Sequence, residues 1–143
     1  MNTQPSRIIL DTDAFSFLHE GKPQASGYGP VLRGAIPCVA FVTVGELLFG
    51  AKSAGWGAPR LGRLQNAIRR CVVLPFNVQL AELWADVKVD AKKNGLPLAH
   101  REHSNDLWIA ACGLFYQAPV LTGNVKHFRD VTGLSTLDGS GKS

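Results

Sequence analysis

Acidic residues occur where apolar, strand-like segments give way to the start of a helix. Asp11 follows the apolar run 8–10, Glu46 follows the run 39–42, and Asp106 opens the apolar segment 107–111. In a parallel α/β sheet the carboxyl ends of the strands lie along one edge, so acids far apart in sequence can converge there. Converging carboxylates with no cysteine or histidine ligand expected nearby suit a hard cation such as Mg²⁺ or Mn²⁺. The pattern therefore predicts a metal site at one edge of a sheet.

Length and composition predict one compact domain. The chain has 143 residues, of which 45% are apolar and 18% charged, and this is enough to bury one ordinary core. We expect the domain to span residues 1–138 and a flexible tail to span 139–143. The apolar runs are too short to cross a bilayer, and the polar first seven residues lack the core of a signal peptide. We therefore expect a cytoplasmic protein.

The cysteine content indicates the redox compartment, and the net charge indicates the kind of binding partner. The cysteines are odd in number and lie in apolar sequence, which favours small buried hydrophobic residues in a reducing compartment over disulfides or zinc ligands. The formal net charge is +4. A basic body around an acidic pocket would steer a polyanion inward. Solvated helix faces that happen to be basic explain the same charge equally well.

Local patterns predict a mainly parallel sheet flanked by helices, an α/β fold. Expected strands cover 7–10, 36–42, 71–75 and 119–122, with a possible edge strand at 133–137. Expected helices cover 11–19, a segment from residue 43, 61–70, 78–94 and a segment from residue 106, with a loop at 21–30. Asp13 is the expected N-cap of the first helix, and Thr43 with Glu46 has the spacing of a capping box.

Motifs spread along nearly the whole chain carry a family resemblance. They are Ile-Ile-Leu-Asp-Thr-Asp at 8–13, Thr-Val-Gly-Glu-Leu-Leu-Phe-Gly-Ala at 43–51, Asn-Asp-Leu-Trp-Ile-Ala-Ala at 105–111 and Val-Leu-Thr-Gly-Asn-Val-Lys-His-Phe at 120–128. With these motifs in this order the chain resembles the PIN-domain ribonucleases and, within them, the VapC-type toxins of type II toxin–antitoxin pairs. The resemblance implies a Mg²⁺- or Mn²⁺-dependent RNA endonuclease, a cognate antitoxin partner that inserts a peptide into the acidic cleft, and a homodimer.

The resemblance also implies a catalytic set, which falls on Asp11, Glu46, Asp106 and Asn124. Asp11 and Asp106 would hold one metal ion, and Glu46 would position water or hold a second ion. Asn124 departs from the most acidic form of the family pattern, because an amide brings no charge. Thr122 is a candidate for orienting water or phosphate through its hydroxyl.

Other readings of the same residues remain open. Each acid alone could simply cap a helix or face its dipole. Asp11 and Asp13 also resemble the nucleophile and acid/base pair of haloacid-dehalogenase-type phosphatases. A third possibility is a non-catalytic RNA- or protein-binding module whose metal site has decayed.

Several aromatic and histidine residues receive non-catalytic interpretations. We read His100 and His103 as residues of a solvent-facing loop, and His127 as a loop contact near the site. Trp84 and Trp108 lie at helical core spacing, which favours packing. Trp56, in a glycine-rich segment, is equally open to packing and to base stacking.

Overall fold

A parallel sheet forms the centre of the molecule in the computed structural model, which describes residues 6–140. The strands are β1 (Arg7–Leu10), β2 (Ile36–Ala40), β3 (Val72–Leu74), β4 (Val120–Leu121) and β5 (Thr136–Leu137). Their order is β3-β2-β1-β4-β5, and every neighbouring pair is parallel. The predicted α/β fold is therefore confirmed.

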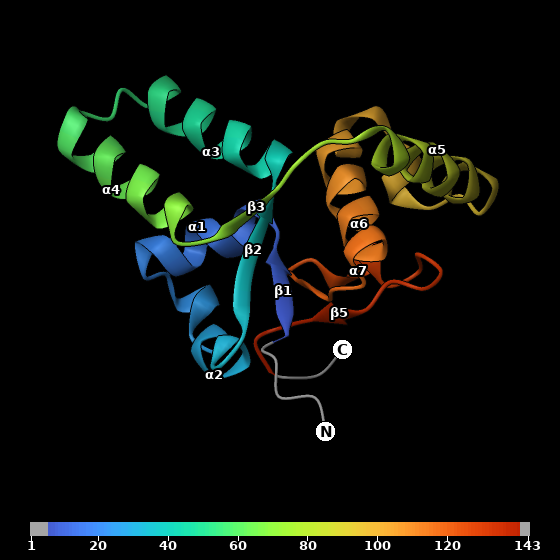
Figure 1. The fold of residues 1–143 in the computed structure, drawn as a ribbon, viewed down its shortest axis with the longest axis horizontal. Coiled ribbons are helices and arrows are strands. Elements are labelled where there is room, and N and C mark those ends of the chain that lie inside the picture. Colours follow the sequence, from blue (N-terminus) through green and yellow to red (C-terminus); the bar gives the residue numbers. More distant parts are fainter. Residues whose placement is uncertain (1–5, 141–143) are drawn as a thin grey trace.

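Helices cover both faces of this sheet (Figure 1). The α-helices are α1 (Thr12–Glu20), α2 (Tyr28–Leu32), α3 (Phe41–Ser53), α4 (Ala58–Arg69), α5 (Val78–Lys93), α6 (Ser104–Tyr116) and α7 (Val125–Phe128). Short 3₁₀ turns occur at η1 (Pro23–Ala25), η2 (Pro97–Ala99) and η3 (Arg101–His103). In the view of Figure 1, α3 and α4 lie on one side of the strands and α5 and α6 on the other.

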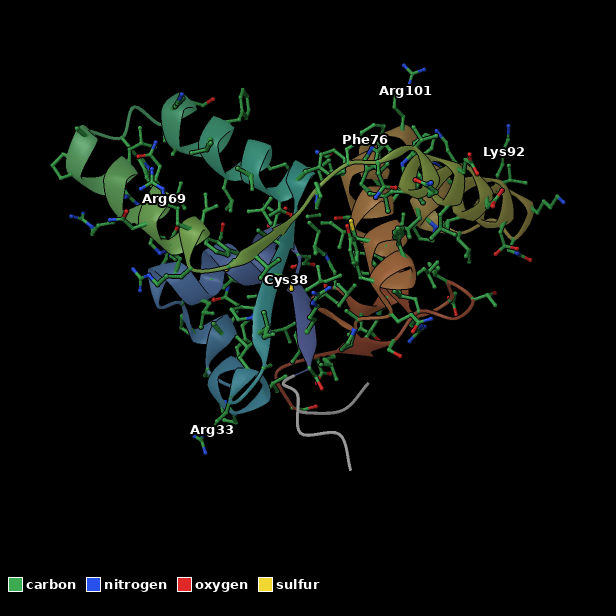
Figure 2. All side chains as sticks on the ribbon, viewed as in Figure 1. Arg33, Cys38, Arg69, Phe76, Lys92 and Arg101 are labelled. Carbon is green, nitrogen blue, oxygen red and sulfur yellow. The ribbon has the colours of Figure 1, made fainter. Side chains whose placement is uncertain are left out.

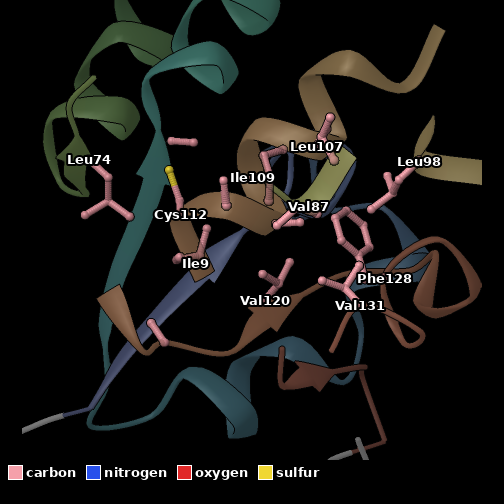
Figure 3. Close-up of a cluster of buried hydrophobic side chains, with 14 of the residues drawn as sticks. Ile9, Leu74, Val87, Leu98, Leu107, Ile109, Cys112, Val120, Phe128 and Val131 are labelled. Carbon is pink, nitrogen blue, oxygen red and sulfur yellow. The ribbon is translucent and has the colours of Figure 1, made fainter. Parts of the chain in front are cut away.

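The alternation of side chains along each strand divides the core into two layers. Ile9 packs with α5 and α6, whereas Ile8 and Leu10 pack with α1 and the helices that follow it. On β4, Val120 packs in the same layer as Ile9, and Leu121 packs in the same layer as Ile8 and Leu10. Figure 3 shows the first of these layers, in which side chains of α6 meet the strands and Phe128 of α7. A sheet buried on both faces explains the continuous apolar strand sequences.

The order in which the chain adds strands to the sheet reverses beside β1. The chain moves outward from β1 to β2 and β3, and then returns to add β4 and β5 on the other side of β1. In such doubly wound sheets the crevice for ligands lies outside the carboxyl ends of the strands at this reversal. Asp11 follows β1 there, and its backbone N–H donates to the carbonyl of Leu121 on β4 at 3.1 Å.

Two capping predictions are wrong. The N-cap of α1 is Asp11, whose Oδ1 accepts from the backbone N–H of Ala14 at 2.8 Å, so Asp13 lies within the first turn of the helix. The helix that carries Glu46 begins at Phe41, before the supposed cap Thr43. It begins early because the strand ends at Ala40, and this places Thr43 inside the first turn, where its side chain is buried.

Smaller differences concern element boundaries. The expected loop at 21–30 contains η1 and the start of α2. The helix expected from residue 106 begins at Ser104 and follows a 3₁₀ turn, so Asp106 does not stand at the end of a strand. The prediction of a flexible tail at 139–143 falls largely on residues 141–143, which lie outside the described range.

Side-chain placement agrees with most of the expectations from composition. Arg33, Arg69, Lys92 and Arg101 project away from the sheet, whereas Cys38 lies at its centre (Figure 2). All three cysteines are free thiols. Trp84 and Trp108 stack at 5.3 Å between ring centroids and pack against the core, as predicted. Within the described part of the chain, no helix is long and apolar enough to cross a membrane.

The close packing around Gly113 of α6 predicts that a side chain at this position destabilises the fold. A Cβ there would lie 2.5 Å from Cδ1 of Leu134 and 3.2 Å from both the Ala118 carbonyl oxygen and Cγ2 of Val120. Crowding of this kind costs about 1–3 kcal/mol. Gly62 of α4 has no such neighbour within 4 Å, so Gly62→Ala is a matched control that gains the same helix propensity.

We therefore expect the free energy of unfolding of Gly113→Ala to fall about 1–3 kcal/mol below that of Gly62→Ala in urea titrations. Equal stabilisation by the two alanines would contradict the close contact of α6 with β4.

Candidate active site

A single acidic cavity of about 180 Å³ brings the predicted site residues together. Asp11 comes from the end of β1, Glu46 from the second turn of α3, and Asp106 from the first turn of α6. The lining residues are Asp11, Thr12, Asp13, Glu46, Glu102, Asn105, Asp106 and Asn124. Five carboxylates and two amides thus face one small space, and none of the described residues that line it has an apolar side chain.

Asp11 is the buried acid of the cavity, with 5% of its surface exposed. Burial raises the pKa of its carboxyl from 3.8 to about 6, and the nearby negative charges of Asp106 and Asp13 add to that rise. Hydrogen bonds from the Thr122 hydroxyl and from the backbone N–H of Ala14 act in the opposite direction. The rise dominates because water is removed from a charge that has acidic neighbours.

Glu46 is held by a chain of hydroxyl groups that the sequence did not reveal. The Thr12 hydroxyl donates to Oε1 of Glu46 at 2.6 Å. Because its only proton is used there, the Thr43 hydroxyl donates to Oγ1 of Thr12, at 3.1 Å. Thr43 is buried and anchored in α3, so the chain fixes Glu46 against α1. This hydrogen bond orients the Glu46 carboxyl group toward α1.

Asp106 lies between the other acids and two imidazoles. Burial raises its pKa above the usual value of 3.8, while His127 and, more weakly, His103 oppose the rise. Oδ2 of Asp106 lies 3.6 Å from Nδ1 of His127 and 3.9 Å from Nδ1 of His103. These separations exceed hydrogen-bond length, so the contacts are electrostatic.

Asn124 reaches the cavity from the loop between β4 and α7. It occupies the N-cap position of α7 but its side chain makes no capping hydrogen bond. Its backbone N–H instead donates to the Thr122 hydroxyl oxygen at 2.8 Å. Asn124 also lines a neighbouring hollow of about 430 Å³ with Asp11, Asp13 and Tyr28. The amide is therefore exposed at the boundary of two hollows rather than engaged as a cap.

The donors around the cavity fit a hard divalent cation. Carboxylate and amide oxygens are the ligands that Mg²⁺ and Mn²⁺ prefer. Burial and, to a smaller extent, the neighbouring acids raise the pKa of Asp11, and a cation would offset both effects. Asp11, Asp106 and Glu46 are the residues that could hold it. On the other side of Asp106, His103 and His127 complete a group whose ligand atoms lie within 4.8 Å of one another.

Some of these placements differ from the expectations. His103 is not on a solvent-facing loop but beside Asp106, because the 3₁₀ turn η3 directs it back toward α6. His127 does lie near the site, as predicted. Thr122 is fully buried, so its hydroxyl supports Asp11 and the 123–124 loop and is not free to meet a phosphate. The one sequence signal for the contact between His103 and Asp106 is their spacing. They are three residues apart near a helix start, and this spacing brings side chains close together on a helix.

The raised pKa of Asp11 gives a stability prediction for the metal-free protein. The folded state binds the proton more tightly than the unfolded state, so the ionised carboxyl destabilises the fold increasingly as pH rises from about 4 to about 6. Asp11→Asn removes the charge and keeps an oxygen that can accept from Ala14. We expect the variant to be more stable than wild type at pH 7, by at most about 3 kcal/mol, with the gain shrinking toward pH 4.

Thermal unfolding of exhaustively dialysed protein at both pH values measures this difference. Asp11→Ala is the control, because it removes the charge and the cap together and should lose about 1 kcal/mol relative to the Asn variant. An Asn variant less stable than wild type at pH 7 would make Asp11 a structural cap whose charge the fold requires.

Comparison with known proteins places the chain in a family. The PIN domain family matches residues 8–134. The ribonuclease VapC1 of Haemophilus influenzae (strain R2866) is 29% identical over 132 residues, which cover 91% of this chain and 96% of that protein. The tRNA(fMet)-specific endonuclease VapC of Shigella flexneri is 25% identical, over 94% of this chain and 98% of that protein.

Solved structures agree in fold. VapBC-1 from nontypeable Haemophilus influenzae superposes with a TM-score of 0.75 at 28% identity, covering 94% of this chain and 98% of that one. DNA-bound VapBC from Salmonella typhimurium gives a TM-score of 0.79 at 21% identity, with the same coverage. With the family match spanning most of the domain and the acidic cavity lying at its sheet edge, the chain belongs to the PIN-domain family.

Proposed function

We propose that this protein is an endoribonuclease of the VapC toxin type, which hydrolyses RNA phosphodiester bonds with a divalent cation in the acidic cavity. One observation carries the proposal: Asp11, Glu46 and Asp106, from three separate elements of a PIN domain, line the same small cavity. The names of the relatives support the substrate class, since VapC1 is called a ribonuclease and the Shigella protein a tRNA endonuclease.

Each acid has a distinct part in this chemistry. Mg²⁺ or Mn²⁺, when bound, would polarise the scissile phosphate and lower the pKa of an attacking water. Asp11 and Asp106 would hold the cation. Glu46, oriented by the hydroxyl of Thr12, is placed to accept a proton from the water. Asn124 contributes a neutral oxygen at the cavity mouth. No side-chain nucleophile is needed.

A track of polar and basic residues leads away from the acids and suits an RNA backbone. Glu46 also lines a second hollow, which reaches Trp56 between α3 and α4. A third hollow continues from Trp56 to Lys22, Arg60 and Arg63. The Arg60 guanidinium lies 3.7 Å from the centroid of the Trp56 ring. The Trp56 ring is half-buried, and cations beside an accessible aromatic ring are elements that single-stranded nucleic acids bind.

The resemblance to VapC proteins also supports a proposal for the binding partners. Several structures that resemble this chain are toxin–antitoxin complexes, so we include a cognate antitoxin that neutralises the toxin by occupying the acidic cleft. We also include a homodimer and action in the cytoplasm, where such an RNA substrate is found. Hydrophobic side chains exposed on the described surface, such as Phe49 and Val78, are available for these contacts.

The alternative functions have less support. A dehalogenase-like phosphatase would need Asp11 as a free nucleophile, but this residue is buried and caps α1. Its supposed partner Asp13 is exposed, and the family match is to the PIN domain. A decayed binding module would not be expected to retain the complete hydroxyl chain that holds Glu46.

Asp106→Asn tests the proposal. It removes the charge while preserving the shape of a partly exposed residue in the first turn of α6, so the fold should persist. We expect cleavage of bulk RNA in Mn²⁺ to fall by a factor of about 10³ or more, and growth inhibition on induction to disappear. Asp86→Asn on α5, outside the cavity, is the matched control. A fully active Asp106→Asn protein would overturn the assignment.

Asn124→Asp tests the role of the amide. The wild-type cavity would hold its second cation weakly, because Asn124 supplies no charge at that position. An added carboxylate should lower the Mn²⁺ concentration for half-maximal cleavage by about tenfold. Titration of cleavage rate against Mn²⁺ for both proteins measures the shift. An unchanged midpoint would place Asn124 outside the metal shell and leave three acids to carry the chemistry.

A further inference from the structure

His103, Asp106 and His127 form a compact cluster on one side of the acidic cavity. The three come from η3, the first turn of α6 and α7, which are separate segments of the chain. One ligand atom from each lies within 4.8 Å of the others. The two imidazole rings are 4.6 Å apart between centroids and steeply inclined, at 60°, so they do not stack on each other.

The chemistry of this cluster differs from that of the acidic cavity. Two imidazole nitrogens and one carboxylate oxygen suit borderline transition-metal ions, whereas Mg²⁺ prefers oxygen alone. Sites of three protein ligands with an open position are typical of zinc that is not purely structural. We propose that His103, Asp106 and His127 form a separate binding site for Zn²⁺, which shares Asp106 with the acidic cavity.

Distances in the cluster are close to those that Zn²⁺ requires. With bonds of about 2.0–2.1 Å in a tetrahedron, ligand atoms stand about 3.3 Å apart. Oδ2 of Asp106 is already 3.6 Å from Nδ1 of His127 and 3.9 Å from Nδ1 of His103. Small side-chain rotations therefore complete the site without movement of the helices.

Two further observations point to a ligand between these groups. Nδ1 of His127 is buried and has no hydrogen-bond partner, although it faces a carboxylate. A buried nitrogen without a partner is costly, and a metal ion would satisfy it. Nε2 of His103 lies 3.8 Å from Oε1 of Glu102, on the ring edge away from Asp106. Carboxylates at the distal nitrogen of a histidine are a common outer support of metal ligands.

Because both sites use Asp106, an ion bound at one site would affect ion binding at the other. An ion bound by the two histidines would engage a carboxylate that the acidic cavity needs for Mg²⁺ or Mn²⁺. Zn²⁺ would therefore compete for Asp106 and regulate the proposed nuclease. The binding step itself does not rest on the proposed function, because it is measurable without RNA.

Direct binding tests the site. Tag-free protein, stripped of metal, is titrated with Zn²⁺ by calorimetry and with Co²⁺ by visible absorption, which reports ligand geometry. We expect one equivalent of ion to bind, with affinity reduced at least about tenfold in His103→Gln and in His127→Gln. His100→Gln is the matched control, because His100 is exposed in the same segment and outside the cluster.

Each result decides the matter. Loss of binding in both cluster variants, with His100→Gln unchanged, supports the site. Absence of saturable Zn²⁺ binding, equal affinity in all three variants, or an equal loss in His100→Gln would overturn it. Circular dichroism and Tm confirm that the variants are folded. Asp11→Asn should impair Mg²⁺ binding much more than Zn²⁺ binding, so failure of the acidic centre and failure of this site are distinguishable.

Discussion

The concentration of negative charge at one edge of the sheet is the constraint on which the rest of the site depends. The carboxyl ends of parallel strands lie along one edge of the sheet. The order β3-β2-β1-β4-β5 places the end of β1 at the point where strand addition switches from one side of β1 to the other. Asp11 is buried there and is surrounded by other carboxylates. Burial and repulsion both oppose its ionisation, which is why its pKa rises to about 6. In the absence of a cation, the ionised Asp11 carboxylate therefore lowers the stability of the fold.

The supporting residues are arranged to limit that loss without removing it. Thr122 and the start of α1 give Asp11 hydrogen bonds, so the carboxylate is oriented although it is partly desolvated. Thr43 and Thr12 do the same for Glu46 from two different helices. Each of these hydroxyls lies at a junction between a core element and the cavity. Rigid support of this kind fixes ligand geometry before any ion arrives.

The fold was predictable from the sequence, and so was the meeting of the candidate acids in one cavity, because both follow from local patterns. Apolar strand runs alternating with helical periodicity imply a parallel sheet, and the acids at 11, 46 and 106 stand in motifs that the family resemblance joins. The prediction of Thr43 as a cap failed for a different reason. Capping depends on where a strand ends, and β2 ends at Ala40, earlier than its apolar run suggests. The helix therefore begins before Thr43, and this residue is free to join Thr12.

Contacts between distant segments could not be read from the sequence. His103 and His127 are 24 positions apart in the chain, and their meeting depends on how η3 and the short α7 pack around α6. The polar stretch before Asp106 looked like exposed loop because nothing local indicates that a 3₁₀ turn directs one of its histidines inward.

Asp106 consequently has two chemically different surroundings, oxygen donors on the cavity side and imidazoles on the other. A carboxylate is a ligand that both hard and borderline cations accept. Because Asp106 lies between the oxygen donors and the imidazoles, a metal ion bound on either side would use the same carboxylate.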